Sequence, residues 1–258
     1  MVNYSLNKIA KITGGRLEGR TDFNIHQLLI DSRSAAVSSS SLFFAIKGRQ
    51  HDGHIYVDEL YQRGIRAFVV SEMQEHFKTY AGAGFIVVPD TLAALQALAA
   101  FHRNQFNIPV IGITGSNGKT IVKEWLFQLM NADRLIVRSP KSYNSQIGVP
   151  LSVLEISNDH NLAIFEAGIS EPGEMEHLET VIRPTLGVFT NIGHAHDENF
   201  HTPQQKAGEK LELFRHSRTL VYCRDYKEIH EEIIKASYLQ ETNKVTWSRA
   251  EAADLFIT

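Results

Sequence analysis

The chain lacks the cysteines that disulfide-bonded and many zinc-binding proteins rely on, since Cys223 is the one cysteine among its 258 residues. A disulfide within the chain is therefore impossible, and a zinc site built from cysteine thiolates is disfavoured. Cys223 ends the apolar run 220–223, a pattern that predicts a buried strand position rather than a nucleophile.

Long apolar runs and a strong charge of one sign are missing as well. No stretch approaches the ~20 apolar residues that a membrane-spanning helix needs, and residues 1–16 lack the continuous apolar core of a signal peptide. The net charge is −3, which indicates no general surface for nucleic acid or other polyanions. We therefore expect a cytoplasmic protein with no membrane insertion and no nucleic-acid partner.

What the sequence does contain is an alternation of short apolar runs and helical periodicity. Hydrophobic residues make up 43% of the chain, enough for a sizeable core in about one to two domains. In the first part we expect strands at 25–30, 42–46, 67–70 and 85–88, and helices around 55–61 and 91–106. A domain boundary is expected near residues 88–90, so that residues 1–89 and 90–258 form two domains.

The second part has a more regular rhythm of strands and helices. The segment 110–114 predicts a strand, and 119–130 predicts a helix because Ile121, Trp125 and Leu129 recur at helical spacing. Further strands are expected at 135–137, 163–166, 186–192, 220–223 and 245–247, with helices near 174–182, 203–215 and 226–237. This order is typical of an α/β protein with a mostly parallel, doubly wound sheet. Residues 254–258 predict the start of one more strand, so we expect a truncated piece of a longer protein.

A glycine-rich segment joins the expected strand 110–114 to the expected helix 119–130. It reads Gly115-Ser116-Asn117-Gly118-Lys119-Thr120. Glycines let the backbone curl so that several N–H groups converge, and the helix N-terminus adds partial positive charge. The lysine can reach the β- and γ-phosphates of a nucleotide, and the threonine hydroxyl can bind Mg²⁺. The general pattern asks for a glycine where Ile113 stands, yet the segment favours a nucleotide site over a plain tight turn.

Polar residues follow the next two expected strands at the same edge of the sheet. Glu166 ends the apolar run 162–165, where its carboxylate could hold Mg²⁺; a salt-bridged or helix-capping glutamate is the alternative. The following strand leads into Asn191-Ile192-Gly193-His194-Ala195-His196-Asp197, in which a histidine could bind metal or orient a group. Lys206 and Lys210 lie on the next helix, and their spacing alone does not separate them from solvated lysines.

Together these motifs resemble those of the Mur ligase family of peptidoglycan synthesis. The run from Thr114 to Thr120 is similar to that family's own phosphate loop, which accounts for the shifted glycine. Two further segments resemble the branch that joins D-alanyl-D-alanine to a UDP-N-acetylmuramoyl-tripeptide. They are Lys123-Glu124 and Tyr143-Asn144-Ser145-Gln146-Ile147-Gly148-Val149-Pro150, in which Ser145 replaces the second asparagine of that branch.

The first part of the chain resembles the substrate domain of the two late-acting ligases of this family. The similar segments are Asp31-Ser32-Arg33, Leu42-Phe43-Phe44-Ala45-Ile46-Lys47-Gly48 and Asp52-Gly53-His54. The resemblance implies that residues 1–89 hold the uridine diphosphate end of the substrate. The candidate substrate contacts are Ser32, Arg33, Lys47, Asn144, Ser145 and Gln146.

For the second part, the resemblance implies a site for ATP and two Mg²⁺ ions. Glu166 and His196 match the family's magnesium ligands, and Lys210 matches its carbamylated lysine. A carbamate turns the lysine cation into an anion that can coordinate a metal. The nucleotide contacts implied are Gly115, Ser116, Asn117, Gly118, Lys119, Thr120 and Asn191. The metal ligands implied are Thr120, Glu166, His196 and Lys210, and the catalytic groups are Lys119, His196 and Lys210.

The activity implied is ATP-dependent formation of an amide. ATP would phosphorylate the terminal carboxylate of UDP-N-acetylmuramoyl-tripeptide, and the amine of D-alanyl-D-alanine would displace the phosphate. Nothing in the sequence matches the family's third, C-terminal domain, so we expect this chain to be inactive alone. We also expect it to be a monomer. Two other classes stay open. One is a related enzyme of the same superfamily. A diamino-acid-adding Mur ligase is disfavoured by the segments Lys123-Glu124 and 147–150, and a folylpolyglutamate synthase is disfavoured by Asp31-Ser32-Arg33. The other is a non-enzymatic nucleotide-binding module.

Overall fold

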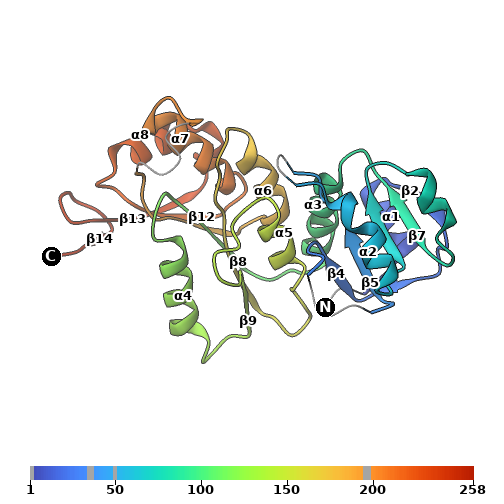
Figure 1. The fold of residues 1–258 in the computed structure, drawn as a ribbon. Helices are drawn as coiled ribbons and strands as arrows, with labels where there is room; N and C mark the ends of the chain where they lie inside the picture. The colour runs from blue at the N-terminus through green and yellow to red at the C-terminus, as the bar shows by residue number, and fades with distance from the viewer. Residues whose placement is uncertain (1–2, 34–37, 49–50, 194–198) are drawn as a thin grey trace. The chain divides into compact units, whose positions relative to one another are not determined.

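The computed structural model describes residues 3–33, 38–48, 51–193 and 199–258 (Figure 1). The chain divides into two compact units, Met1–Phe101 and His102–Thr258. The division falls within helix α3 (Thr91–Arg103), beyond the segment 88–90 where the sequence suggested a boundary. The start of α3 is fastened to the first unit, because the Thr91 hydroxyl donates to the Ala45 carbonyl at 3.0 Å. The extent of the functional domains stays a prediction.

The first unit is built on a five-stranded sheet with the order β2-β7-β6-β5-β4, in which only β2 runs antiparallel to its neighbour. The strand expected at 25–30 is wrong as a single element. It is divided into β3, which pairs with β1, and β4, which pairs with β5. The elements are β1 (Tyr4–Ser5), α1 (Leu6–Thr13), β2 (Arg16–Gly19), β3 (Asn24–Ile25), β4 (Gln27–Leu29), β5 (Ser41–Phe44), the 3₁₀ helix η1 (Gly53–Tyr56), α2 (Val57–Gln62), β6 (Ala67–Val70), η2 (Glu75–Thr79), β7 (Gly84–Val87) and α3.

Aromatic rings fill the centre of the first unit. Phe85 of β7 stacks on Phe68 of β6 with ring centroids 5.2 Å apart and on Phe77 of η2 at 5.4 Å. All three side chains are buried. The first unit therefore has a hydrophobic core of its own, as an independently folding domain requires.

The second unit is a seven-stranded parallel sheet with the order β14-β13-β12-β11-β8-β10-β9. This confirms the expected α/β architecture. β8 lies between β10 and β11, so the segments that follow these three strands meet at one edge of the sheet. The elements are β8 (Val110–Thr114), α4 (Lys119–Met130), β9 (Ile136–Arg138), α5 (Gly148–Val153), β10 (Leu162–Glu166), α6 (Glu174–Ile182), β11 (Leu186–Phe189), α7 (Pro203–Leu211), η4 (Glu212–Phe214), β12 (Thr219–Cys223), α8 (Lys227–Lys235), η5 (Ser237–Leu239), β13 (Asn243–Ser248) and β14 (Leu255–Phe256).

Helix α4 covers one face of the sheet only in part. Val122, Leu126 and Met130 of α4 pack against the β-strand residues Ile111, Ile113, Leu162 and Ile164. Along the same face, the strand register aligns Ile113 with Val188, Val221 and Val245. Ile113 is fully buried, Val188 and Val221 are half-buried, and Val245 is 37% exposed. Burial thus falls with distance from α4, although parallel sheets are normally covered on both faces. Figure 1 shows α4 on one side of the strands and α7 with α8 on the other.

The prediction that 119–130 forms a helix is confirmed, but the stripe that indicated it does not face the sheet. Ile121, Trp125 and Leu129 are exposed, whereas the row of Val122, Leu126 and Met130, one residue further along, packs on the strands. In the described part of the chain, every helix is too short or too polar to cross a membrane.

Candidate functional site

The glycine-rich segment forms a tight loop between β8 and α4. Gly115 has φ +141° and Gly118 has φ +79°, backbone conformations that side-chain-bearing residues rarely adopt. A Cβ at position 115 would also lie 2.0 Å from the Thr190 hydroxyl oxygen. Both glycines are therefore required by the path of the chain, and α4 begins directly after the second of them.

The segment that follows β11 holds the loop in place. The backbone N–H of Ser116 donates to the Asn191 carbonyl at 2.9 Å, and that of Asn117 donates to the Asn191 side-chain oxygen at 3.0 Å. The Ser116 hydroxyl donates to the Gly193 carbonyl and accepts from the Gly193 N–H. The Thr190 hydroxyl donates to the Asn117 carbonyl at 2.6 Å. The residues that follow β11 thus hold the loop that follows the neighbouring strand β8.

Lys119 folds back over this loop. Its ammonium donates to the Gly115 carbonyl at 2.8 Å and to the Ser116 carbonyl at 3.4 Å. Burial lowers the pKa of Lys119, and the negative charge of Glu166 acts in the opposite direction. The Lys119 ammonium lies at the N-terminus of α4. Its positive charge adds to the helix dipole, which also favours an anion at this place.

Glu166 is fully buried at the end of β10, next to β8. One carboxylate oxygen accepts from the Thr120 hydroxyl at 2.8 Å, and the other lies 3.3 Å from the Lys123 ammonium. A buried carboxylate without such partners would be strongly destabilising. Thr120 and Glu166 are thus in contact, as their expected positions after neighbouring strands indicated. Glu166 also forms a salt bridge with Lys123, which was the alternative interpretation of this residue.

Two lysines of α7 are buried close to the loop. Lys206 donates to the Gly193 carbonyl at 2.5 Å. The pKa of Lys210 is lowered to about 7 by burial first and then by the charges of Lys119 and Lys206. Lys210 lies one helical turn after Lys206 in α7 and is buried as well, and the sequence spacing alone did not distinguish these two lysines from solvated ones.

The segment 143–146 lies beside the end of β10. The Asn144 carbonyl accepts from the Gly168 N–H at 2.8 Å, and the Asn144 side chain lies against Gly168. The Ser145 hydroxyl accepts from the Gly148 N–H at 3.1 Å, and the Gln146 amide donates to the Glu174 carbonyl at 3.0 Å. Asn144 thus contacts the chain two residues after Glu166, while the side chains of Ser145 and Gln146 bond to nearby backbone groups.

In the first unit, the candidate substrate residues follow the neighbouring parallel strands β4 and β5. Ser32 is buried, and its carbonyl accepts from the Arg63 guanidinium. Arg33 is exposed and donates two hydrogen bonds to Asp31, at 2.9 and 2.7 Å. The Lys47 ammonium lies 4.0 Å from the Asp52 carboxylate. The ends of the two strands therefore present cationic groups at one edge of this sheet.

The donor set for a metal is described only in part. His196, with His194 and Asp197, lies outside the described residues. Within the described ranges, no group of three or more His, Cys, Asp or Glu side chains could hold a metal ion. The Glu166 carboxylate and the Thr120 hydroxyl are oxygen ligands of the kind that Mg²⁺ prefers. Lys210 as a free amine fits less well, and it would become such a ligand only after conversion to an anion.

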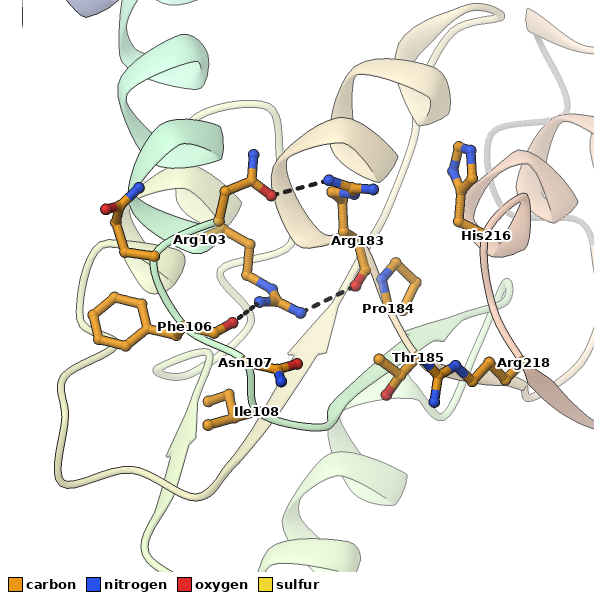
Figure 2. Close-up of a pocket in the computed structure, with 11 residues that line it drawn as sticks. Arg103, Phe106, Asn107, Ile108, Arg183, Pro184, Thr185, His216 and Arg218 are labelled. Carbon is orange, nitrogen blue, oxygen red and sulfur yellow. Dashed lines mark hydrogen bonds between the residues drawn. The ribbon is translucent and has the colours of Figure 1, made fainter.

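A cavity of about 450 Å³ lies elsewhere in the second unit, before the amino ends of β8, β11 and β12 (Figure 2). Arg103 crosses it and donates to the carbonyls of Phe106 at 2.7 Å, Ile182 at 2.9 Å and Arg183 at 3.3 Å. Arg183 donates in turn to the Asn104 side chain. These contacts join the ends of α3 and α6, and the cavity lies at the opposite edge of the sheet from the phosphate loop.

Two contributors to the site were given no role in it from the sequence, although Lys123 was noted as part of the segment Lys123-Glu124. Thr190 bonds to the loop across the gap between β8 and β11, and Lys123 contacts Glu166 from inside α4. The signal for Thr190 was its position at the end of a strand. The signal for Lys123 was weaker, because a lysine in an amphipathic helix is normally solvated.

The fold and this site define a class. A parallel α/β sheet whose central strand ends in a glycine-rich loop, followed by a helix that begins with Lys-Thr, is a phosphate-loop nucleotide-binding protein. Residues 113–258 match the family model described as Mur ligase middle domain, and residues 24–103 match Mur ligase family, catalytic domain. The chain belongs to the Mur ligase family, as the sequence motifs indicated.

Individual relatives agree with this assignment. The chain is 37% identical over 213 residues to the UDP-N-acetylmuramoyl-tripeptide–D-alanyl-D-alanine ligase of Treponema pallidum, covering 80% of this chain and 46% of the relative. It is 30% identical over 235 residues to the Bacillus subtilis enzyme of the same name, covering 87% and 50%. The chain therefore spans about half the length of the curated relatives it matches.

Solved structures give the same result. MurF from Acinetobacter baumannii superposes with a TM-score of 0.87 at 25% identity, over 97% of this chain and 54% of the other. The MurF ligase from Thermotoga maritima, in complex with ADP, superposes with a TM-score of 0.76 at 27% identity, over 88% and 51%.

Proposed function

We propose that this chain carries the nucleotide site and the UDP-substrate unit of an ATP-dependent ligase that adds D-alanyl-D-alanine to UDP-N-acetylmuramoyl-tripeptide. The printed names of its relatives describe this reaction, and one similar structure contains ADP. The observation that carries the proposal is the loop between β8 and α4, held by Asn191 and Gly193, with Thr120 bonded to Glu166.

The loop would bind the phosphates of ATP through its N–H groups and the N-terminus of α4. Lys119 would leave the carbonyls of Gly115 and Ser116 and donate to the phosphate oxygens instead. Mg²⁺ held by Glu166 and Thr120, together with His196, would supply charge neutralisation for phosphoryl transfer. The substrate carboxylate takes the γ-phosphoryl group and releases ADP. The amine of D-alanyl-D-alanine then attacks the acyl phosphate, forming the amide and releasing phosphate.

Lys210 has a separate proposed role as a carbamate. Its pKa of about 7 leaves much of the side chain as neutral amine near neutral pH, the form that can attack carbon dioxide. The carbamate would replace a buried cation by an anion beside Lys119 and Lys206, which relieves like-charge repulsion. It would also provide the oxygen donors that the free amine lacks.

For the UDP-substrate, the two cationic groups of the first unit are the proposed contacts. Arg33 and Lys47 are exposed and could exchange their carboxylate partners for a diphosphate, since guanidinium and ammonium groups both bind phosphate. Ser32 would be a neighbouring contact. Asn144, Ser145 and Gln146 would receive the peptide end near the phosphate loop.

The test is phosphate release by the complete polypeptide that carries this chain, with ATP, Mg²⁺, UDP-N-acetylmuramoyl-tripeptide and D-alanyl-D-alanine. Lys119→Ala should reduce turnover by about 10²–10³-fold, the usual cost of one preorganised donor. Lys227→Ala, which changes an exposed lysine of α8, is the matched control and should turn over normally. Full turnover by a folded Lys119→Ala variant contradicts the nucleotide assignment. Turnover with a diamino acid in place of D-alanyl-D-alanine contradicts the branch.

A further inference from the structure

Lys123 is a lysine with no exposed surface, inside an otherwise amphipathic helix. Its ammonium donates to the Ser139 carbonyl at 2.7 Å and to the Lys141 carbonyl. It also lies 3.3 Å from Glu166 and 3.4 Å from Glu124. All of its hydrogen-bonding capacity is therefore used within the protein. Burying a cation is costly unless it is paired in this way. Packing alone therefore does not explain why a lysine occupies this buried position.

The reason lies in how the Glu166 carboxylate is held. Thr120 and Lys123 are three residues apart and share one face of α4. The Thr120 hydroxyl donates to one carboxylate oxygen and the Lys123 ammonium faces the other. Glu166 is thus held from both sides by the helix that also begins with Lys119. A carboxylate with two fixed oxygens can present its remaining lone pairs in one arrangement only.

The same ammonium also organises the turn 139–141 after β9. The Ser139 hydroxyl accepts from the Glu166 N–H at 3.3 Å, so this turn touches Glu166 independently of Lys123. Lys141 has φ +50°, a conformation that is unfavourable for a residue with a side chain. The contact between the Lys141 carbonyl and the Lys123 ammonium helps to hold the turn, which leads directly into the segment 143–146.

We propose that Lys123 is a positioning residue that sets Glu166 and the turn 139–141 in one arrangement. One buried ammonium thereby aligns the metal-site carboxylate with the chain that leads to the peptide-binding segment. The inference rests on the proposed nucleotide function. A merely structural lysine would stabilise the fold without affecting what Mg²⁺ adds to nucleotide binding.

The experiment measures the affinity of the 258-residue chain for ADP by calorimetry, with Mg²⁺ and with EDTA. The ratio of the two affinities is the gain from the metal. Lys123→Met keeps the apolar stem and removes the charge, so we expect the gain to fall about 10- to 100-fold, as for other residues that support a metal ligand. The affinity in EDTA should be retained, because the loop and Lys119 are unchanged. Glu124→Gln removes the other carboxylate near the ammonium and should keep the gain.

Each outcome decides the inference. A folded Lys123→Met variant with the parent's metal gain overturns it, and so does a loss of gain in Glu124→Gln equal to that in Lys123→Met. Should Lys123→Met fail to fold, Lys123→Met/Glu166→Gln replaces both charges and is compared with Glu166→Gln alone. Equal affinities of the double variant and Glu166→Gln for ADP with Mg²⁺ support the inference, because Lys123 then acts through Glu166. A further tenfold loss of affinity in the double variant overturns it. A parent chain without any metal gain instead contradicts the proposed function.

Discussion

At the scale of single residues, the surroundings of the phosphate loop are unusual in burying several lysines. Each is accommodated differently. Lys123 is paired with Glu166, and Lys206 donates to the Gly193 carbonyl. Lys210 is instead accommodated by a pKa lowered to about 7. Because neutralising an amine avoids the cost of burying a charge, Lys210 is the group whose protonation should affect the stability of the chain.

The lowered pKa of Lys210 predicts that metal-free stability depends on pH. An unfolded lysine titrates near 10.5, and the folded one near 7. Between these values the unfolded state binds more protons, so the free energy of unfolding rises with pH across the window, by on the order of 5 kcal/mol in total. Below the window both states are protonated and the cost of the buried charge is present in full. Lys210→Met should therefore be stabilised relative to the parent at about pH 6.5 and lose more than half of this advantage by about pH 9.

Thermal unfolding in EDTA, followed across this pH range, measures the difference. Lys227→Met, at an exposed position of α8, is the control and should show a difference from the parent that does not change with pH. If Lys210→Met and the parent gave parallel profiles, Lys210 would not be the buried titrating group.

At the scale of elements, helix α4 shows what periodicity can and cannot predict. Its sequence contains two apolar rows one residue apart, so the helical period was clear while the buried face was ambiguous. The row of Val122 and Leu126 packs on the strands, and Lys123 lies beside Glu166. The row of Trp125 and Leu129 was left 64% and 77% exposed.

This exposed row predicts binding of apolar probes. Replacing Trp125→Lys together with Leu129→Glu should lower the fluorescence of the dye ANS and reduce self-association seen by light scattering. Stability should change by only about 0.5 kcal/mol per site, as is usual for surface substitutions. Ile234→Lys, at a 63% exposed residue of α8, is a matched control outside the row and should leave the signal nearly unchanged. Equal dye binding by the double variant and the parent would show that the row is not the apolar surface that matters.

Other elements mark the limit of sequence-based prediction. Strands β6 and β8 and helices α4 and α6 agree with the expected ranges because their apolar runs are long and clearly bounded. Helix α1 was missed although Ser5 caps it and Leu6, Ile9 and Ala10 form its buried face, since it is only eight residues long. In the site, Thr120 and Glu166 were foreseeable, because Thr120 lies in the first turn of the helix after β8 and Glu166 ends the neighbouring strand β10. The contact of Lys123 was not, because it depends on how α4 lies on the sheet.

At the scale of the whole molecule, the proposed reaction draws on two units with separate cores. The aromatic core of the first unit contains no residue of the second, and every described residue of the phosphate site belongs to the second. We therefore propose that the two ligands bind to different folding units: the UDP end of the substrate to the first and the nucleotide to the second.

This separation predicts that the two binding functions can be lost one at a time. Phe68 is fully buried and stacks on Phe85, so Phe68→Ala should destabilise the first unit by about 3–5 kcal/mol. We expect weakened binding of UDP-N-acetylmuramoyl-tripeptide with unchanged affinity for ADP, both measured by calorimetry. Phe189→Ala, at a buried position of strand β11 in the second unit, is the reciprocal variant and should weaken ADP binding while sparing the UDP-substrate. If either substitution abolished both affinities in a single cooperative unfolding transition, the two units would not be independent and the division of the ligands between them would be wrong.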